Sequence, residues 1–155
     1  MRKFLRPTLA VAALAVTGLA TPAAYAALGG NYQSVQNDSA VIKAQLRSTE
    51  TNLYTVHELS NDSTSVVREY VSTSGQVFAV TWQGFGMPDL RQLLGDYFTQ
   101  YTAAAKSQRR PGMHRFSQVT QSDLVVQNAG RMRSFRGRAY VPSLVPSGVS
   151  ISDLP

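Results

Sequence analysis

The sequence contains no cysteine, which excludes disulfide bonds, thiolate metal sites, a cysteine nucleophile and a lipid-modified cysteine. Only two histidines are present, His57 and His114, and no HExxH or similar spacing surrounds them, so no metal site is predicted. His57 and Glu58 are neighbours on a predicted strand, so they point to opposite faces and are not expected to bind one ion. His57 is expected on the exposed face. No P-loop, dinucleotide fingerprint or GxSxG motif occurs, and no cofactor is predicted.

Long hydrophobic runs are also scarce. The longest covers about 13 residues, from Thr8 to Ala20, whereas a membrane span needs about 20. Arg2, Lys3 and Arg6 precede this run, and a small-residue Ala-x-Ala pattern follows it at residues 24–26. These are the three parts of a secretory signal peptide, so cleavage after residue 26 is predicted. We therefore expect a periplasmic or secreted protein with no membrane span after cleavage, and export makes nucleic acid an unexpected partner.

The remaining composition is that of one small globular domain, with 155 residues of which 43% are hydrophobic and 15% charged. The formal net charge is +6, but it is unevenly distributed. Residues 27–105 carry four basic and seven acidic side chains, whereas residues 106–138 carry eight basic side chains and one acid. This asymmetry predicts either an anionic partner or internal pairing between the two halves.

Three segments rich in Val, Tyr, Thr, Phe and Trp predict an antiparallel meander over residues 52–60, 64–73 and 76–83. Two-residue turns at 62–63 and 74–75 would fix the register. That register places one mainly apolar set on a single face: Tyr54, Val56, Glu58, Val67, Glu69, Val71, Phe78, Val80 and Trp82. The opposite face would carry Thr55, His57, Arg68, Tyr70, Ala79 and Thr81.

Helical periodicity occurs on both sides of this meander. Apolar steps of three and four residues predict a helix within 34–47. A stronger stripe, rich in Leu, Tyr and Phe, predicts one long amphipathic helix from Pro88 to about Lys106, which would cover the apolar face of the sheet.

The C-terminal region predicts a β-hairpin followed by a tail. Residues 117–127 and 131–141 resemble strands around a turn at 128–130, and the prolines and serines of 142–155 predict an extended tail without regular structure. The fold class is therefore α+β: a single domain over 27–141, with an antiparallel meander covered by an amphipathic helix, an N-terminal helix and a C-terminal hairpin.

Two groups of residues are candidates for a site. The first is the basic hairpin with its aromatic neighbours: Arg131, Arg133, Arg136, Arg138, Phe135 and Tyr140. On a continuous strand, Arg131 and Arg133 would share a face with Phe135, and Arg136 and Arg138 would share the other with Tyr140. Arginine forks match carboxylates and phosphates, so an anionic envelope glycan, a lipid head group or an acidic protein surface is the expected partner. Solvated or internally paired arginines are the structural alternative.

The second candidate is the carboxylate pair Glu58 and Glu69. The predicted register places both on the apolar face, close enough for one pKa to be raised, as general-acid catalysis requires. The alternative is that arginines from the C-terminal half or the helix neutralise them.

Several of these segments, in this order, resemble an uncharacterised family of secreted proteobacterial proteins, domain of unknown function 2844. The matching blocks are Tyr54–Glu58, Val67–Val71, Val77–Val80 before Trp82, Pro88–Gly95 with Tyr97 and Phe98, and Gly137–Pro142. The resemblance extends over nearly the whole chain after residue 26. The resemblance implies export and a single domain, and it implies no activity, ligand or catalytic residue.

Three functions are therefore open. The leading hypothesis is an exported, non-catalytic accessory or binding protein that recognises an anionic envelope component or a partner protein through the basic hairpin. The alternative is a small envelope hydrolase with Glu58 and Glu69 as acid and base. A third is a structural subunit whose tail, from Pro142 onward, docks on another chain.

Overall fold

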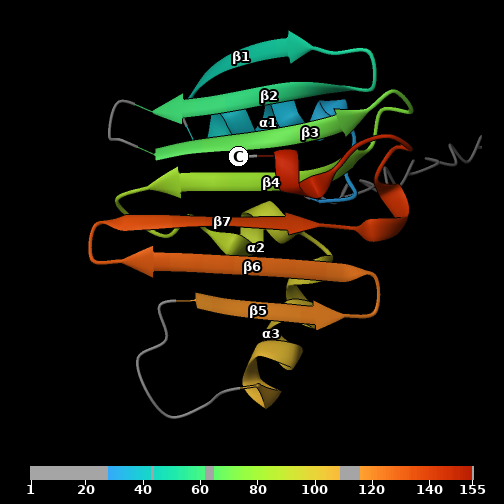
Figure 1. Cartoon of the computed structure of the whole chain (residues 1–155). Helices are drawn as coiled ribbons and strands as arrows, with labels where there is room; N and C mark the ends of the chain where they lie inside the picture. The colour runs from blue at the N-terminus through green and yellow to red at the C-terminus, as the bar shows by residue number, and fades with distance from the viewer. Residues whose placement is uncertain (1–27, 43, 62–64, 109–115, 155) are drawn as a thin grey trace, which may run out of the picture.

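The computed structural model describes residues 28–42, 44–61, 65–108 and 116–154. These residues form an α+β fold built on a seven-stranded antiparallel sheet with strand order β1-β2-β3-β4-β7-β6-β5 (Figure 1). The first four strands form a meander, and β7 pairs with β4 so that the last three strands extend the same sheet. The strands are β1 Gln45–Glu50, β2 Tyr54–Asn61, β3 Ser65–Ser72, β4 Val77–Gly84, β5 Phe116–Gln121, β6 Leu124–Arg131 and β7 Ser134–Tyr140.

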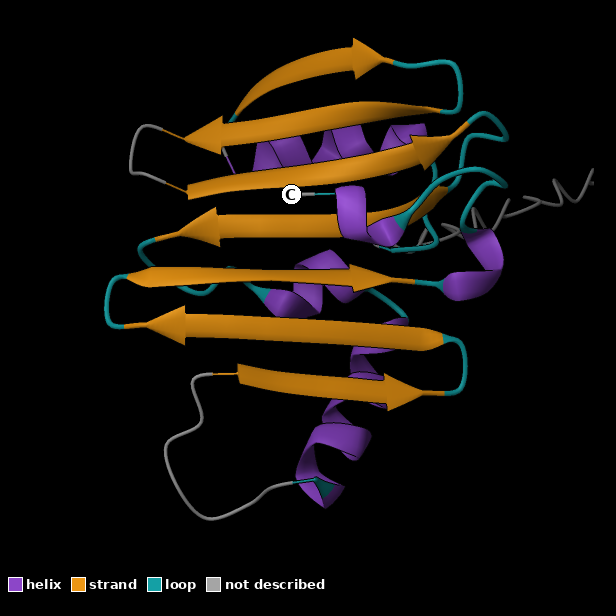
Figure 2. Cartoon of the chain, in the orientation of Figure 1, coloured by secondary structure: helices purple, strands orange, loops and turns teal. Residues whose placement is uncertain are grey.

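The three α-helices of the described residues lie behind the sheet, and the C-terminal segment crosses in front of it (Figure 2). The helices are α1 Tyr32–Ile42, α2 Leu90–Leu94 and α3 Tyr97–Ser107, and the C-terminal segment contains the 3-10 helices η1 Pro142–Leu144 and η2 Ile151–Asp153. We call the two sides of the sheet the helix face and the front face.

The main core lies between the helix face and the helices. Cross-strand neighbours Val67 of β3 and Trp82 of β4 contribute to it, and α2 adds the fully buried Leu93 and Leu94. Each large apolar side chain buried in this way stabilises the fold by about 1.5–3 kcal/mol before entropy is considered. This layer fixes the sheet against the helices.

A second, smaller apolar cluster lies on the front face under the C-terminal segment. Tyr70, Phe78 and Ala79 of the sheet pack with Leu154, and Tyr54 and Tyr140 border them. The expectation of a tail without regular structure is therefore wrong. Residues 142–154 form two 3-10 turns and pack on their own sheet because the front face carries its own set of apolar side chains.

The predicted register of the first hairpin is wrong by one residue. Glu58 pairs with Arg68 instead of Val67, and the last pair is Asn61 with Ser65, so three residues instead of two separate the paired ends. A one-residue shift moves every side chain of a strand to the other face. Residues 54, 56 and 58 therefore face the front, whereas Thr55 and His57 face the helices.

The register of the second hairpin is confirmed over most of its length. Val67 pairs with Trp82 and Glu69 with Val80, as predicted. Val71 pairs with Val77 instead of Phe78, because a β-bulge between Tyr70 and Val71 leaves Phe78 as the extra residue. The bulge places Phe78 in the front cluster, although it was predicted on the same face as Val67.

Both predicted helices are shorter than expected. The N-terminal helix ends at Ile42, and the residues from Gln45 form the edge strand β1, which was not predicted. The long helix is interrupted at Gly95, whose φ of 49° and ψ of −121° are not helical. Gly95 ends α2, and α3 begins two residues later, so one predicted helix becomes two.

The predicted turn at 128–130 does not exist. Strand β6 continues through these residues to Arg131, and tight turns lie instead at 122–123 and at 132–133, where Ser122 and Arg133 adopt positive φ. Gly130 has a different role from the predicted one, because a Cβ at this position would lie 2.6 Å from Cδ1 of the Phe135 ring. The glycine allows an aromatic ring to lie against the strand instead of forming a turn.

Candidate anion-binding groove

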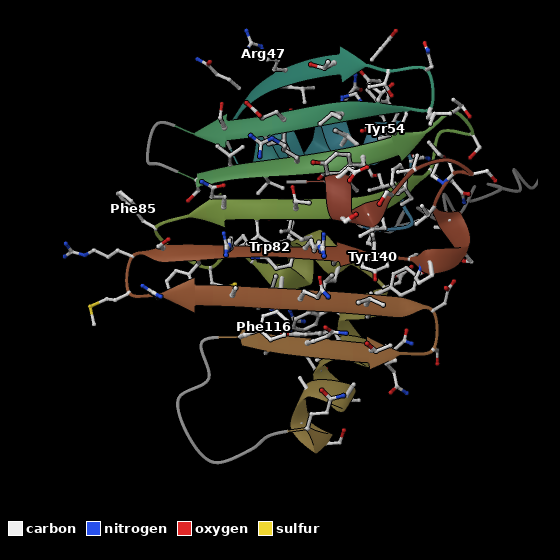
Figure 3. All side chains as sticks on the ribbon, in the orientation of Figure 1. Arg47, Tyr54, Trp82, Phe85, Phe116 and Tyr140 are labelled. Carbon is white, nitrogen blue, oxygen red and sulfur yellow. The ribbon has the colours of Figure 1, made fainter. Side chains whose placement is uncertain are left out.

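A polar row crosses the front face and takes one side chain from each strand. The strand register aligns seven residues from the edge strand β1 to the opposite edge strand β5: Arg47, Glu58, Arg68, Thr81, Arg138, Gln127 and Gln118. Side chains directly opposite each other on neighbouring strands are close enough to interact. The row separates the apolar cluster under the C-terminal segment from the open end of the front face, and Figure 3 labels Arg47 at one side of the sheet and Phe116 toward the other.

The two inner arginines of this row have different partners. Arg68 Nε donates to Glu58 Oε2 at 2.8 Å, which is a salt bridge. Arg138 Nε donates to Gln127 Oε1 at 2.6 Å, and its Nη1 donates to the backbone oxygen of Ile151 at 2.7 Å. Arg138 is therefore held in place by neutral acceptors, and its positive charge is not balanced by a carboxylate within hydrogen-bond distance in the described chain.

A groove of about 470 Å³ lies over this part of the row. Its lining includes three arginines, two glutamines, one exposed aromatic ring and one leucine of the C-terminal segment: Arg68, Arg136, Arg138, Gln83, Gln127, Phe116 and Leu154. No aspartate or glutamate is among the lining residues. The groove is therefore a basic hollow that offers amide groups and an apolar wall, a combination suited to an anionic ligand.

Arg136 connects this groove to a second hollow. It is exposed, and the neighbouring hollow of about 430 Å³ is lined by Ala129, Gly130, Arg131, Ser134 and Arg136. Arg131 pairs with Ser134 across the turn, so Arg131, Arg136 and Arg138 all lie on the front face. The structure therefore brings together three of the four predicted arginines.

The predicted division of these arginines between two faces is wrong. Arg131 lies on β6, while Arg136 and Arg138 lie on β7, and the turn at Met132 and Arg133 interrupts the run that the sequence predicts as one strand. Arg133 occupies this turn and is exposed.

The two predicted aromatic residues lie outside the groove. Phe135 packs on the helix side against Gly130, and Tyr140 belongs to the apolar cluster under the C-terminal segment. The aromatic ring of the groove is Phe116, the first residue of the edge strand β5. Phe116 and Arg68 are not predicted as site residues from the sequence, because their nearness to the basic hairpin depends on strand pairings between distant segments.

The predicted carboxylate pair is not formed. Glu58 faces the front and binds Arg68, whereas Glu69 is buried on the helix face opposite His57. The arrangement therefore does not support a mechanism in which the two carboxylates act as acid and base. The prediction of neutralisation is partly right for Glu58, but its arginine comes from the adjacent strand and not from the C-terminal half.

His57 is buried, contrary to the expectation of an exposed side chain. Its Nδ1 lies 2.8 Å from Ser48 Oγ, and its ring centroid lies 5.1 Å from that of Tyr32. Burial lowers the pKa of the imidazole, because the charged form loses hydration. His57 is therefore a neutral packing residue at neutral pH.

The described ranges contain neither a metal-binding cluster nor a membrane-spanning helix. No group of three or more His, Cys, Asp or Glu side chains there is arranged to hold a metal ion. No described helix is long and apolar enough to cross a membrane. The predicted signal segment, residues 1–26, lies outside the described residues, as does His114.

Comparison with known proteins gives a family but no activity. No curated protein and no solved structure matches the chain. A family model matches residues 24–154, which include the basic hairpin, the groove and the C-terminal segment. The chain therefore belongs to the family described as protein of unknown function (DUF2844).

Proposed function

We propose that the protein is an exported, non-catalytic binding protein of the bacterial cell envelope, and that it binds an acidic glycan in the groove on its front face. Export rests on the N-terminal sequence, where a basic start, a short apolar run and an Ala-x-Ala ending occur in order. Binding rests on the charge and lining of the groove.

The observation that carries the proposal is the imbalance of charge in the groove. Three arginines line a hollow of about 470 Å³ that has no acidic lining residue. Glu58 neutralises Arg68 from outside the lining, so the excess positive charge comes from Arg136 and Arg138, and Arg138 is positioned by an amide and a backbone carbonyl. A guanidinium held by neutral acceptors keeps its charge available to a ligand. Hydrogen bonds from arginine to a carboxylate are roughly twice as strong as neutral ones.

The other lining groups favour a sugar acid over a simple ion. Gln83 is exposed, and its amide can both donate and accept, as hydroxyl groups of a sugar require. Gln127 is half-buried and already accepts from Arg138 and donates to Gln118. Phe116 is 57% exposed and presents an aromatic surface at the edge of the groove. The volume lies within the range of about 300–1,000 Å³ typical of small-ligand sites, so a few sugar units would fit.

Calorimetric titration with a polyuronate oligosaccharide tests this proposal, with the neutral oligosaccharide of the same length as the first control. The decisive variant is Arg136→Gln, because Arg136 is exposed and holds no other described side chain in place. We expect a loss of roughly tenfold in affinity, since a charge-assisted hydrogen bond is worth about 1.5–3 kcal/mol.

Arg47→Gln is the matched control for this experiment. Arg47 is also an exposed front-face arginine, but it lies on the edge strand β1, away from the groove. Equal binding of the acidic and neutral oligosaccharides, or equal losses in the two arginine variants, would contradict the proposal.

A further inference from the structure

Two loops meet at one end of the sheet, where β4 and β7 lie side by side. Gly84 at the end of β4 pairs with Phe135 near the start of β7, and Arg131 pairs with Ser134 across the β6–β7 turn. The residues that follow Gly84 and those of the turn therefore project from the same end of the sheet, where Figure 3 labels Phe85. We call this surface the arginine tip: Phe85, Met87, Arg131, Met132 and Arg133.

The apolar side chains of the arginine tip are unusually exposed. Met132 is 91% exposed and Phe85 61%, and these are the two most exposed large hydrophobic side chains in the described part of the protein. Single exposed hydrophobic residues are common, but large ones grouped at one place mark an interaction surface. Here they come from two separate loops that the β4–β7 pairing brings together.

The charges of the arginine tip have one sign. Arg131 and Arg133 are exposed, and the one salt bridge in the described ranges, between Arg68 and Glu58, involves neither of them. The nearest described acid along the β4–α2 loop is Asp89, whose side chain accepts from the backbone nitrogen of Arg91 and caps α2. The tip is therefore both cationic and apolar.

A hollow of about 430 Å³ lies directly beside this surface, between Arg131 and Arg136. Its other lining residues are Ala129, Gly130 and Ser134, which have small or no side chains. Two guanidinium groups around an open hollow suit a phosphate group, because arginine forks bind phosphate oxygens in pairs. The exposed Met132 follows Arg131 directly in the chain.

From this arrangement we infer that the arginine tip docks the protein on an anionic phospholipid bilayer. Arginines bind lipid phosphates at the surface, while Phe85 and Met132 enter the boundary between head groups and acyl chains, about 5–10 Å deep. Each arginine close to an anionic membrane surface strengthens binding, and the apolar side chains add to it. A second copy of this chain is the less suitable occupant, because two such tips would repel each other.

This inference goes beyond the proposed function, because the five tip residues are not in the lining of the glycan groove. Arg136 lines both hollows and is left unchanged in the test, so variants of the tip residues separate the two proposals. A protein that binds the bilayer through this end would hold its front-face groove beside the membrane surface, where envelope glycans and membrane meet.

Vesicle co-sedimentation tests the inference. The protein is produced from the full chain, and its N-terminal segment is left as the producing cell leaves it. Vesicles of phosphatidylcholine alone are compared with vesicles of equal parts phosphatidylcholine and phosphatidylglycerol. Two double variants remove the two contributions separately: Arg131→Gln with Arg133→Gln, and Phe85→Ser with Met132→Ser. Because all proteins carry the same N-terminus, any contribution of that segment is common to them.

We expect the chain to bind the anionic vesicles and each double variant to bind at least roughly tenfold more weakly. High salt should weaken binding of the unchanged protein, since surface charges are screened. The matched control is Arg47→Gln with Leu53→Ser, which removes an exposed arginine and an exposed leucine away from the arginine tip and should bind like the unchanged protein. Arg138→Gln, which alters the groove, should also keep vesicle binding.

Three results would overturn the inference. The first is equal vesicle binding by the unchanged protein and both tip variants. The second is equal binding to neutral and anionic vesicles. The third is that the unchanged protein is a dimer by light scattering and that the tip variants alone are monomers, although they bind vesicles as the unchanged protein does. This result would assign the surface to a second copy. Polyuronate binding by the tip variants, measured in parallel, shows whether the groove is intact and keeps the two proposals distinguishable.

Discussion

The two faces of the sheet place their polar side chains in different environments. On the helix face, His57, Glu69 and Asn128 are buried under or beside the helices. On the front face, the row from Arg47 to Gln118 crosses all seven strands, and only one end of that face is covered by the C-terminal segment. The helix face is therefore the main source of stability, whereas the front face combines a small apolar cluster with a charged surface open to a ligand.

Two arginines of the front face also differ in their surroundings. Arg68 is neutralised by Glu58, while Arg138 is oriented by Gln127 without being neutralised. Two arginines in one row thus have opposite roles, and the identity of the neighbouring acceptor decides which. An amide orients a guanidinium and leaves its charge available, whereas a carboxylate cancels the charge.

The largest expected effect is on the helix face, at Gly137. A Cβ there would lie 2.5 Å from the Trp82 ring and 2.6 Å from the backbone oxygen of Gln127. Gly137→Ala should therefore lower the free energy of unfolding by about 3 kcal/mol, the upper end of the range for overpacking. Gly86→Ala is the control, since nothing lies within 4 Å of its Cβ position, and urea unfolding of both proteins measures the difference. A small effect at Gly137 would show that the two halves of the sheet are loosely joined.

The next effect concerns the covered end of the front face. Leu154 is 4% exposed and contacts the cluster of Tyr70 and Phe78. Leu154→Ala should cost about 2 kcal/mol, the lower end for a buried leucine, because a chain end relaxes easily. The exposed Ser152→Ala should change stability by less than about 0.5 kcal/mol. Similar thermal midpoints for the two variants would mean that the C-terminal segment adds nothing to stability.

A smaller, pH-dependent effect distinguishes His57. Burial lowers its pKa below the ordinary value of 6.5, so the folded protein binds fewer protons than the unfolded chain at mildly acidic pH. The stabilising contribution is complete above about pH 6.5 and decreases as pH falls below that value. His57→Gln should flatten the fall in unfolding free energy between about pH 7 and pH 5. His114 is present in both proteins, so its contribution cancels in the comparison. If the unfolding free energy of His57→Gln depends on pH as steeply as that of the unchanged protein, a group other than His57 causes the dependence.

The smallest stability effects are expected where the acceptor of each inner arginine is changed, from amide to carboxylate at Gln127 and from carboxylate to amide at Glu58. Gln127→Glu should raise the free energy of unfolding by about 0.5 kcal/mol, as part-exposed ion pairs do, and it should abolish binding of an anionic ligand. Glu58→Gln should lower stability by a similar amount and strengthen ligand binding by leaving Arg68 unneutralised. Stability and polyuronate affinity should therefore change in opposite directions in both proteins, and a change in the same direction would contradict the comparison.

Much of the fold was predictable because alternation and helical spacing are local properties. The pairing of Val67 with Trp82 follows from such a pattern and is confirmed. The position of Glu58 failed for a physical reason, since one additional loop residue reverses the direction of every side chain on a strand. The sequence predicts a turn at Gly130 because a glycine that makes room for Phe135 and a glycine that bends the chain look alike in sequence.

The candidate site was predictable only in part. Arg136 and Arg138 were found from charge alone, but their convergence with Arg68 and Phe116 depends on the β4–β7 pairing between distant segments. No local pattern contains that information. Charge along one segment therefore predicts Arg136 and Arg138, whereas the residues that distant strands bring beside them are missed.

The backbone at Arg133 has a consequence for the apex of the β6–β7 turn. Its φ of 61° lies in a region where glycine is favoured and most other residues are strained, at a cost of order 1 kcal/mol. A glycine at this position would make the hairpin more stable and would remove the long cationic side chain from its outermost point. Arg133 therefore occupies a position where glycine would give a more stable turn, so folding stability does not account for this residue.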